Sequence, residues 1–151
     1  GSGSLKPLNA NHDTEYHSSS VYGGSFDYQW PLSSWLSTSL MVHESGGEGS
    51  MPTKSEYKYY KSGIIGLQLK IWMGPLYLGV HGGQYYLTWI ESMSAYSGIQ
   101  QAGGSGYSIG FETSSGWFLA AFSDQSETFS FDEMPDQQVE GNRVMLGYRW
   151  K

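Results

Sequence analysis

The sequence contains no cysteine, so it can form neither a disulfide framework nor a thiolate metal site. Charge is scarce as well: charged side chains make up 15% of the residues, against about 25% in an average globular protein. The net charge is −6. Because nucleic-acid binding needs clustered lysine and arginine, we expect no nucleic-acid partner. No apolar run approaches the ~20 residues that a membrane-spanning helix requires.

Helix signals are almost absent too. No sustained 3.6-residue periodicity of apolar side chains is present, and Gly, Ser, Tyr and Trp stand where a helix favours Ala, Leu and Glu. Instead, apolar and polar side chains alternate in runs bounded by turn residues, which predicts strands. We expect strands at about 20–30, 35–43, 57–73, 76–89, 102–113, 117–124 and 142–151.

The connections between these runs alternate in length. Tight turns are expected at 31–34, 74–75 and 114–116, and long polar segments at 44–56, about 90–101 and 125–141. This alternation is typical of an up-and-down barrel whose two ends meet different surroundings.

Each run divides into two chemically different faces. In the stretch IGLQLKIWM (65–73), Ile, Leu, Leu, Ile and Met alternate with Gly, Gln, Lys and Trp. Only the run 117–124 is ambiguous, because large side chains occupy both parities. An eight-stranded barrel has an interior that side chains just fill, so the small polar face fits inside and the bulky apolar face does not. The pattern therefore predicts apolar side chains outside, as in a barrel dissolved in lipid.

The inward face carries charge. Asp27, Lys70, Glu112 and Arg149 share this parity on different strands, and two acids with two bases sum to zero. Because unpaired buried charges are costly, we expect them to form a hydrogen-bonded network that plugs the lumen. His81 has the same parity and is predicted to join this lumen network as a hydrogen-bond partner.

Several stretches resemble the small outer-membrane barrels of the OmpX/Ail type. They are YGGSFDYQW, the aliphatic hairpin 64–80, YSIGFE and above all the terminal VMLGYRWK. The resemblance covers about residues 18–151 and implies eight strands in a Gram-negative outer membrane, with both termini on the periplasmic side. In that family an aromatic residue near the C-terminus is part of the signal read by the outer-membrane assembly machinery. Trp150 matches that residue, although Lys151 follows it.

The start of the chain departs from this pattern. Seven strands leave the barrel one strand short, and residues 3–9 make a poor strand because Pro7 removes a ladder donor. Either these residues form a weak closing strand, which we favour, or the first strand lies upstream of this chain. We interpret 1–19 as a tag remnant (GSGS) plus an N-terminal segment, and 20–151 as the barrel domain.

An enzymatic alternative rests on the stretch HSS at 17–19. It resembles the motif of lipid A deacylase barrels, whose catalytic His and Ser sit two residues apart on a strand. That resemblance implies His17 as the base, Ser19 as the nucleophile and Glu15 as the orienting carboxylate. The family motif lies late in its chain, whereas this stretch lies near the N-terminus, so a non-enzymatic protein is favoured.

Two clusters near the long loops are candidate interaction sites. A basic-aromatic cluster suited to anionic headgroups or a host surface component consists of Lys54, Tyr57, Lys58, Tyr59, Tyr60 and Lys61. An acidic loop that could collect divalent cations, although without EF-hand spacing, contains Asp132, Glu133 and Asp136. An ordinary solvated loop explains the acidic cluster as well, and an extracellular strand extension with exposed amphipathic side chains explains the basic-aromatic one. We expect no metal or other cofactor.

The sequence thus predicts an integral outer-membrane barrel that displays long loops for adhesion, host-factor binding or envelope integrity. Its expected partners are outer-membrane lipid and lipopolysaccharide, the assembly machinery and a surface or host protein. The alternatives are a lipid A-modifying enzyme and a soluble, lipocalin-like ligand carrier with the two faces reversed.

Overall fold

The computed structural model describes residues 2–7, 16–18, 21–48, 59–92, 95–96, 99–130 and 137–149. Regular structure in these ranges consists of strands only. The strands are β1 (Ser2–Pro7), β2 (Tyr16–Ser18), β3 (Val21–Pro31), β4 (Leu36–Glu48), β5 (Tyr59–Met73), β6 (Leu76–Ser92), β7 (Ala95–Tyr96), β8 (Gln100–Glu112), β9 (Trp117–Ser126) and β10 (Gln137–Tyr148).

Across the described ranges, no helix is long and apolar enough to cross a bilayer.

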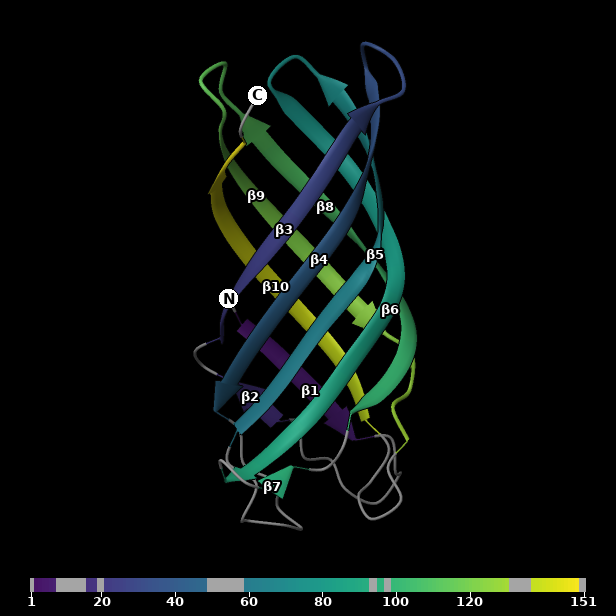
Figure 1. Cartoon of the computed structure of the whole chain (residues 1–151), viewed down its shortest axis with the longest axis vertical. Helices are drawn as coiled ribbons and strands as arrows, with labels where there is room; N and C mark the ends of the chain where they lie inside the picture. The colour runs from purple at the N-terminus through teal and green to yellow at the C-terminus, as the bar shows by residue number, and fades with distance from the viewer. Residues whose placement is uncertain are drawn as a thin grey trace.

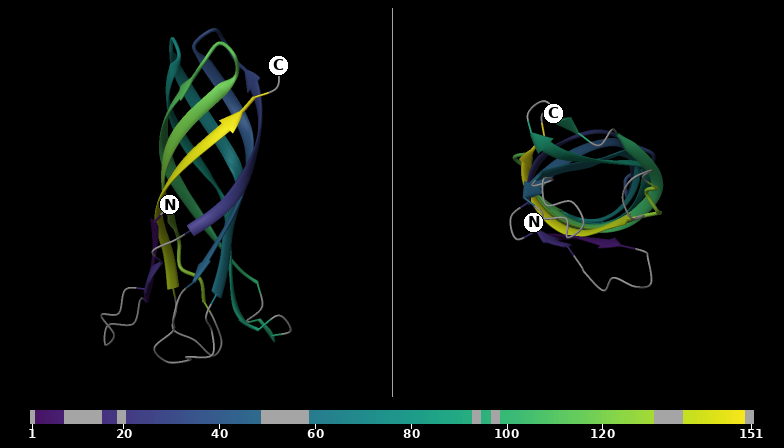
Figure 2. Two further views of the ribbon diagram at one scale, coloured as in Figure 1. Left: turned by 90° about the vertical axis from the view of Figure 1, so that its left-hand side faces the viewer. Right: turned by 90° about the horizontal axis from the view of Figure 1, so that it is seen from below.

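All the strands belong to one antiparallel sheet, in the order β2-β1-β10-β9-β8-β6-β5-β4-β3, with β7 paired to β6. The long strands β3 to β6 and β8 to β10 follow one another up and down, each beside its neighbour in sequence. The sheet curls round on itself, as the view along its length shows (Figure 2). The predicted class, an all-β up-and-down barrel, is confirmed.

The tight turns lie together at the upper end in Figure 1, which we call the turn end. They occupy 32–35, 74–75 and 113–116, close to the predicted positions. Gly74 and Gly116 have φ of 65° and 95°, a backbone conformation that side chains disfavour. The opposite end, which we call the loop end, is where β4 ends and β5 begins. There β4 continues to Glu48 and β10 begins at Gln137, so both strands extend further than predicted.

A strand forms at the beginning of the chain. β1 pairs with β10 from Ser2↔Asn142 to Pro7↔Gln137 and with β2 from Gly3↔Ser18 to Leu5↔Tyr16. It therefore includes Ser2 to Ser4 of the GSGS stretch, which the sequence alone suggests is a tag remnant. Only residues 19 and 20 separate β2 from β3 in the sequence, so the two ends of the sheet belong to adjacent stretches of chain.

The predicted faces are confirmed in the turn-end half of the barrel. The apolar parity is solvent-exposed, and Leu67, for example, is 59% exposed. The ambiguous run is resolved in β9, where Trp117 and Leu119 point outward while Ala120 and Phe122 are buried. The outward apolar side chains of this half, which we call the apolar belt, are Phe26, Tyr28, Leu40, Val42, Ile65, Leu67, Leu69, Ile71, Met73, Leu76, Leu78, Val80, Tyr107, Ile109, Phe111, Trp117, Leu119, Val144, Leu146 and Tyr148.

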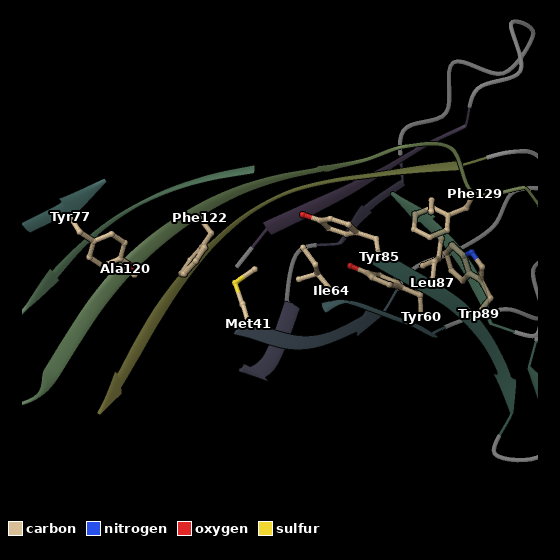
Figure 3. Close-up of a cluster of buried hydrophobic side chains, with 11 residues drawn as sticks. Met41, Tyr60, Ile64, Tyr77, Tyr85, Leu87, Trp89, Ala120, Phe122 and Phe129 are labelled. Atoms are coloured by element: carbon tan, nitrogen blue, oxygen red, sulfur yellow. The ribbon is translucent and has the colours of Figure 1, made fainter. Parts of the chain in front are cut away.

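The pattern reverses toward the loop end. There most of the large inward side chains are apolar, and Ile64, Leu87 and Trp89 are 0% exposed. The outward positions are polar, among them Glu44 and Gln84. Figure 3 shows the buried apolar side chains strung along the interior, from Tyr77 at one end to Trp89 and Phe129 at the other. The long strands thus have an outward apolar surface over one half and an inward apolar core over the other.

Candidate functional site

The lumen near the turn end holds a network of paired charges. The Lys70 ammonium, with its side chain 3% exposed, donates to the Asp27 carboxylate on β3. It also donates to Gln29 Oε1 at 3.1 Å. Arg149, just beyond β10, donates to the same Gln29 oxygen at 2.9 Å and forms an ion pair with Glu112 on β8 at 2.6 Å. The four charged residues singled out in the sequence therefore lie together, as two ion pairs joined through Gln29.

Two aromatic rings contact the cations of this network. Lys70 Nζ lies 5.2 Å from the centre of the Tyr77 ring, and the Arg149 guanidinium lies 5.7 Å from that of Trp72. Trp72 Nε1 in turn donates to Ser37 Oγ at 2.8 Å. A glycine makes room for one ring: a Cβ at Gly110 would lie 2.2 Å from Tyr77 Cε1. The absence of a side chain at the inward position Gly110 therefore leaves room for the Tyr77 ring.

A second charged cluster lies deeper in the lumen, around Asp124 on β9. Its carboxylate accepts hydrogen bonds from His81 Nε2 at 2.6 Å, Tyr85 Oη at 3.1 Å and Arg143 Nη1 at 2.5 Å. The Arg143 guanidinium also stacks 4.7 Å from the Phe122 ring centre. Among the described residues, His81 forms its hydrogen bond within this cluster and none with the Lys70 network. The lumen therefore holds two charge clusters where the sequence predicted one.

Several buried polar atoms near this cluster have no hydrogen-bond partner within the described part of the chain. They are both ring nitrogens of His43, Nδ1 of His81, and Nε and Nη2 of Arg143. His43 is only 5% exposed and pairs in the ladder with Ser25 of β3. Buried polar groups of proteins are nearly always hydrogen-bonded, so this side of the lumen has unused hydrogen-bonding capacity.

The loop-end lumen is closed by an apolar plug. Trp89 packs against Tyr60, with ring centres 5.6 Å apart, and donates from Nε1 to Gln137 Oε1 at 3.0 Å. Phe129, which forms an isolated bridge with Gln137, is fully buried beside them. Apolar side chains therefore occupy the interior at the loop end, and paired charges occupy it at the turn end.

The outer surface beyond the apolar belt is polar at the loop end. Lys61 Nζ and Tyr86 Oη both donate to the Glu44 carboxylate at 3.3 Å. Glu44 and Lys61 also line an open groove of about 510 Å³, together with glycines of β3 and β4, Tyr59, Tyr60 and Ile90. The basic-aromatic cluster predicted from the sequence divides here: Tyr59 and Lys61 are exposed, whereas Tyr60 is buried in the plug.

Other sequence-predicted residues lie outside the described residues. These are Lys54, Tyr57 and Lys58 of the basic-aromatic cluster, Asp132, Glu133 and Asp136 of the acidic loop, and Glu15 and Ser19 of the enzymatic alternative. His17 lies in the short strand β2. Among the described side chains, no three His, Asp or Glu residues come together as a potential metal site.

Sequence reasoning missed the centre of the second cluster. Arg143 has the same parity as Arg149 in the last run, so its inward direction was available from the alternation. Asp124 ends the run whose parity was ambiguous, and Tyr85 was hidden because the apolar pattern reverses in its half of β6. What the sequence reading lacked was the change along each strand from an outward to an inward apolar face. Assigning one apolar face to a whole run does not reveal this change.

Comparisons with known proteins found no match to this chain among family models, curated proteins or solved structures. The fold and the filled lumen define an all-β up-and-down barrel with an apolar outer belt.

Proposed function

We propose that the protein is an integral outer-membrane barrel of the OmpX/Ail type. In this proposal it is not an enzyme, and it displays its loop end at the cell surface for adhesion, host-factor binding or envelope integrity. The observation that carries the proposal is the belt of exposed apolar side chains around a lumen that contains buried charges.

The height of the apolar belt supports this proposal. On β5 the outward apolar side chains run from Ile65 to Met73. With a rise of ~3.3 Å per residue and a tilt of ~40°, this stretch spans about 20 Å along the barrel axis, near the ~25 Å apolar band of outer-membrane barrels. Soluble monomers rarely expose contiguous apolar patches of more than a few hundred Å², and this belt includes residues from β3 to β6 and from β8 to β10.

The side chains in the lumen argue against a ligand carrier. A lipocalin-like carrier needs an apolar interior with room for a ligand. Here the turn-end interior holds Lys70, Asp27, Arg149 and Glu112 in ion pairs, and the loop-end interior is packed with aromatic side chains. We therefore place the function on the outer surfaces and loops.

The reversal of the two faces supports an orientation. In the loop-end half the outer surface is polar, with Lys61 and Tyr86 both hydrogen-bonded to Glu44, and the core lies inside. This half suits an aqueous environment, so the loop end stands clear of the lipid and the turn end lies toward the periplasm. Outer-membrane barrels combine short periplasmic turns with longer extracellular loops.

A refolding trial with and without detergent tests the proposal. We expect a compact, heat-sensitive form on SDS gels, seen as different mobilities of unboiled and boiled samples, only when detergent or lipid is present. The reason is that the apolar belt has no other way to leave water. A chain that folds and stays monomeric in plain buffer would contradict the membrane assignment.

A further inference from the structure

The open groove on the outer wall of the barrel at the loop end has the size of a small-molecule site. Its volume is about 510 Å³, and small-molecule sites measure between about 300 and 1,000 Å³. It crosses β3 to β6, which lie side by side in the sheet (Figure 1). We call it the wall groove, and its lining residues of outward parity are Gly24, Glu44, Gly46, Tyr59, Lys61 and Ile90.

Glycine leaves open space in the wall groove. A Cβ added at Gly24 would meet no atom within 4 Å, and one at Gly46 would have Tyr60 O at 3.1 Å as its nearest neighbour. Positive φ is confined to Gly74 and Gly116 among the described glycines, so backbone conformation does not require glycine at either position of the groove. A glycine inside a strand often marks a place where a ligand approaches the backbone closely.

An aromatic ring and an aliphatic side chain form one edge of the wall groove. Tyr59 is 46% exposed, and Ile90 lies directly opposite it in the β5–β6 ladder. The face of an aromatic ring is electron-rich, so it attracts the weakly positive C–H groups on the face of a sugar ring. Tyr59 therefore offers a stacking surface beside the glycines.

A polar group stands beside this apolar edge. Lys61 Nζ and Tyr86 Oη both donate to the Glu44 carboxylate at 3.3 Å, and the side chains of Lys61 and Glu44 are 54% and 57% exposed. An ammonium group has three donors, and a carboxylate has about four acceptor positions. Both groups therefore keep capacity to donate to and accept from the hydroxyl groups of a ligand.

The charges of the wall groove favour a neutral ligand. Lys61 and Glu44 carry opposite charges within one hydrogen-bonded group. A phosphate or sulfate would meet the Glu44 carboxylate as a like charge, and Lys61 already has its counter-ion. A neutral polyol meets no such repulsion. Stacking surface, hydroxyl partners and cancelled charge together match a neutral sugar.

The position of the wall groove indicates where that sugar comes from. Glu44 is the next outward residue after the belt residue Val42, and Gly24 stands in the same relation to Phe26. One such step of two residues corresponds to ~5 Å along the barrel axis, and the headgroup layer beyond the hydrocarbon core is ~5–8 Å thick on each side. In the proposed membrane setting, the groove opens sideways at the level of the lipid headgroups.

We propose that the wall groove binds the neutral sugar headgroup of a glycolipid in the surrounding outer leaflet. A sugar ring lies on Tyr59, its hydroxyl groups bond to Glu44 and Lys61, and its edge enters the space beside Gly24. The saccharide chemistry rests on the groove alone. Assigning the sugar to a membrane lipid rests on the proposed function.

Titration with lactose, a neutral soluble disaccharide, tests the saccharide chemistry. The labelled protein is observed by amide NMR in dodecylphosphocholine, a detergent without a sugar headgroup, or in buffer if it folds there. We expect saturable shifts at Gly24, Gly46 and Lys61. Gly24→Leu should weaken binding about tenfold or more, because the leucine side chain occupies the space that the sugar needs.

The matched control is Ser105→Leu. Ser105 is an exposed outward residue two positions before the belt residue Tyr107, as Gly24 is before Phe26, but it lies outside the wall groove. This variant should bind lactose as the parent does. If Gly24→Leu does not fold, Tyr59→Ala replaces it and should weaken binding likewise. Absent shifts, or equal affinity of the parent and the groove variant, would overturn the proposal.

Lipid retention tests the source of the sugar. The protein is refolded in vesicles of phosphatidylcholine that contain equal amounts of digalactosyl diacylglycerol and phosphatidylglycerol, then extracted in detergent, and the retained lipids are quantified by mass spectrometry. We expect the galactolipid to be enriched over phosphatidylglycerol in the parent and in Ser105→Leu, and the enrichment to be lost in Gly24→Leu or Tyr59→Ala.

Preferential retention of phosphatidylglycerol would overturn the proposal, since the groove would then bind an anionic headgroup. Lactose binding without galactolipid enrichment would overturn the glycolipid assignment and point to a soluble glycan. A chain that folds in buffer and binds lactose at the wall groove would refute the membrane function while leaving the saccharide site in place. The two failures are therefore distinguishable.

Discussion

The charged residues inside the barrel determine how its lumen is closed. Lys70 is 2% exposed and reaches its counter-ion on another strand, as does Arg149. A buried charge is tolerated only when it is paired and hydrogen-bonded, and removing one partner leaves the other desolvated. The inward charges therefore act as a matched set whose members depend on one another.

Replacing Lys70 with methionine should destabilise the folded barrel by about 3 kcal/mol, because Asp27 then lacks its counter-ion in a narrow lumen. Urea unfolding of the refolded protein in lipid vesicles measures this loss. The double variant Lys70→Met with Asp27→Leu should recover much of the stability, since no unpaired charge remains.

The matched control is Lys61→Met, which breaks an exposed ion pair with Glu44. An exposed pair contributes at most about 1 kcal/mol, so this variant should unfold close to the parent. Equal losses for Lys61→Met and Lys70→Met would contradict the assignment of Lys70 to a buried network.

At the scale of the strands, the main feature is that each long strand has two halves with opposite outward character. β5 is apolar outside from Ile65 to Met73, whereas its other end presents Lys61 outward and buries Ile64. The hairpin partner β6 changes in the same way between Val80 and Gln84. This division sets the boundary of the membrane-facing surface in the proposed function.

An arginine on the belt distinguishes a lipid-facing surface from a water-facing one. Leu67→Arg should destabilise the barrel in vesicles by about 2–4 kcal/mol, the cost of arginine near the midplane on the lipid face of a barrel. Unfolding in urea gives the value.

Gln84→Arg, at an outward position beyond the belt, should cost no more than about 1 kcal/mol. If Leu67→Arg is as well tolerated as Gln84→Arg, the belt does not face lipid.

At the scale of the whole molecule, two independent fillings close the barrel. Ion pairs with aromatic rings occupy the turn end, and the plug around Trp89 and Phe129 occupies the loop end. Between them lies the Asp124 cluster. In the proposed function, such an interior leaves binding to the outer surfaces and loops.

We expect no ion conductance above background when the protein is inserted into planar bilayers, because both ends of the lumen are filled. The double variant Trp89→Ala with Phe129→Ala should also remain closed, since the turn-end ion pairs are unaffected. Discrete single-channel steps from the parent protein would show that the lumen holds a continuous water path, contrary to this expectation.

The sequence by itself determined the class of fold and the direction of most side chains in the turn-end half. Period-2 alternation assigns a side chain to one of two faces, and the bulk of Leu, Ile and aromatic residues excludes that face from a narrow lumen. The inward positions of Asp27, Lys70, Glu112 and Arg149 follow from this parity and bulk, and the turn residues of 74–75 and 114–116 predict the two turns.

Only the tertiary structure decided which inward charges meet. Parity gives the face of a side chain but not its height in the barrel, which depends on the register of every ladder between two strands. The ladders bring Lys70 to Asp27, 43 positions away, and His81 to Asp124, also 43 positions away. The reversal at the loop end likewise arises because the tilted strands extend beyond the belt.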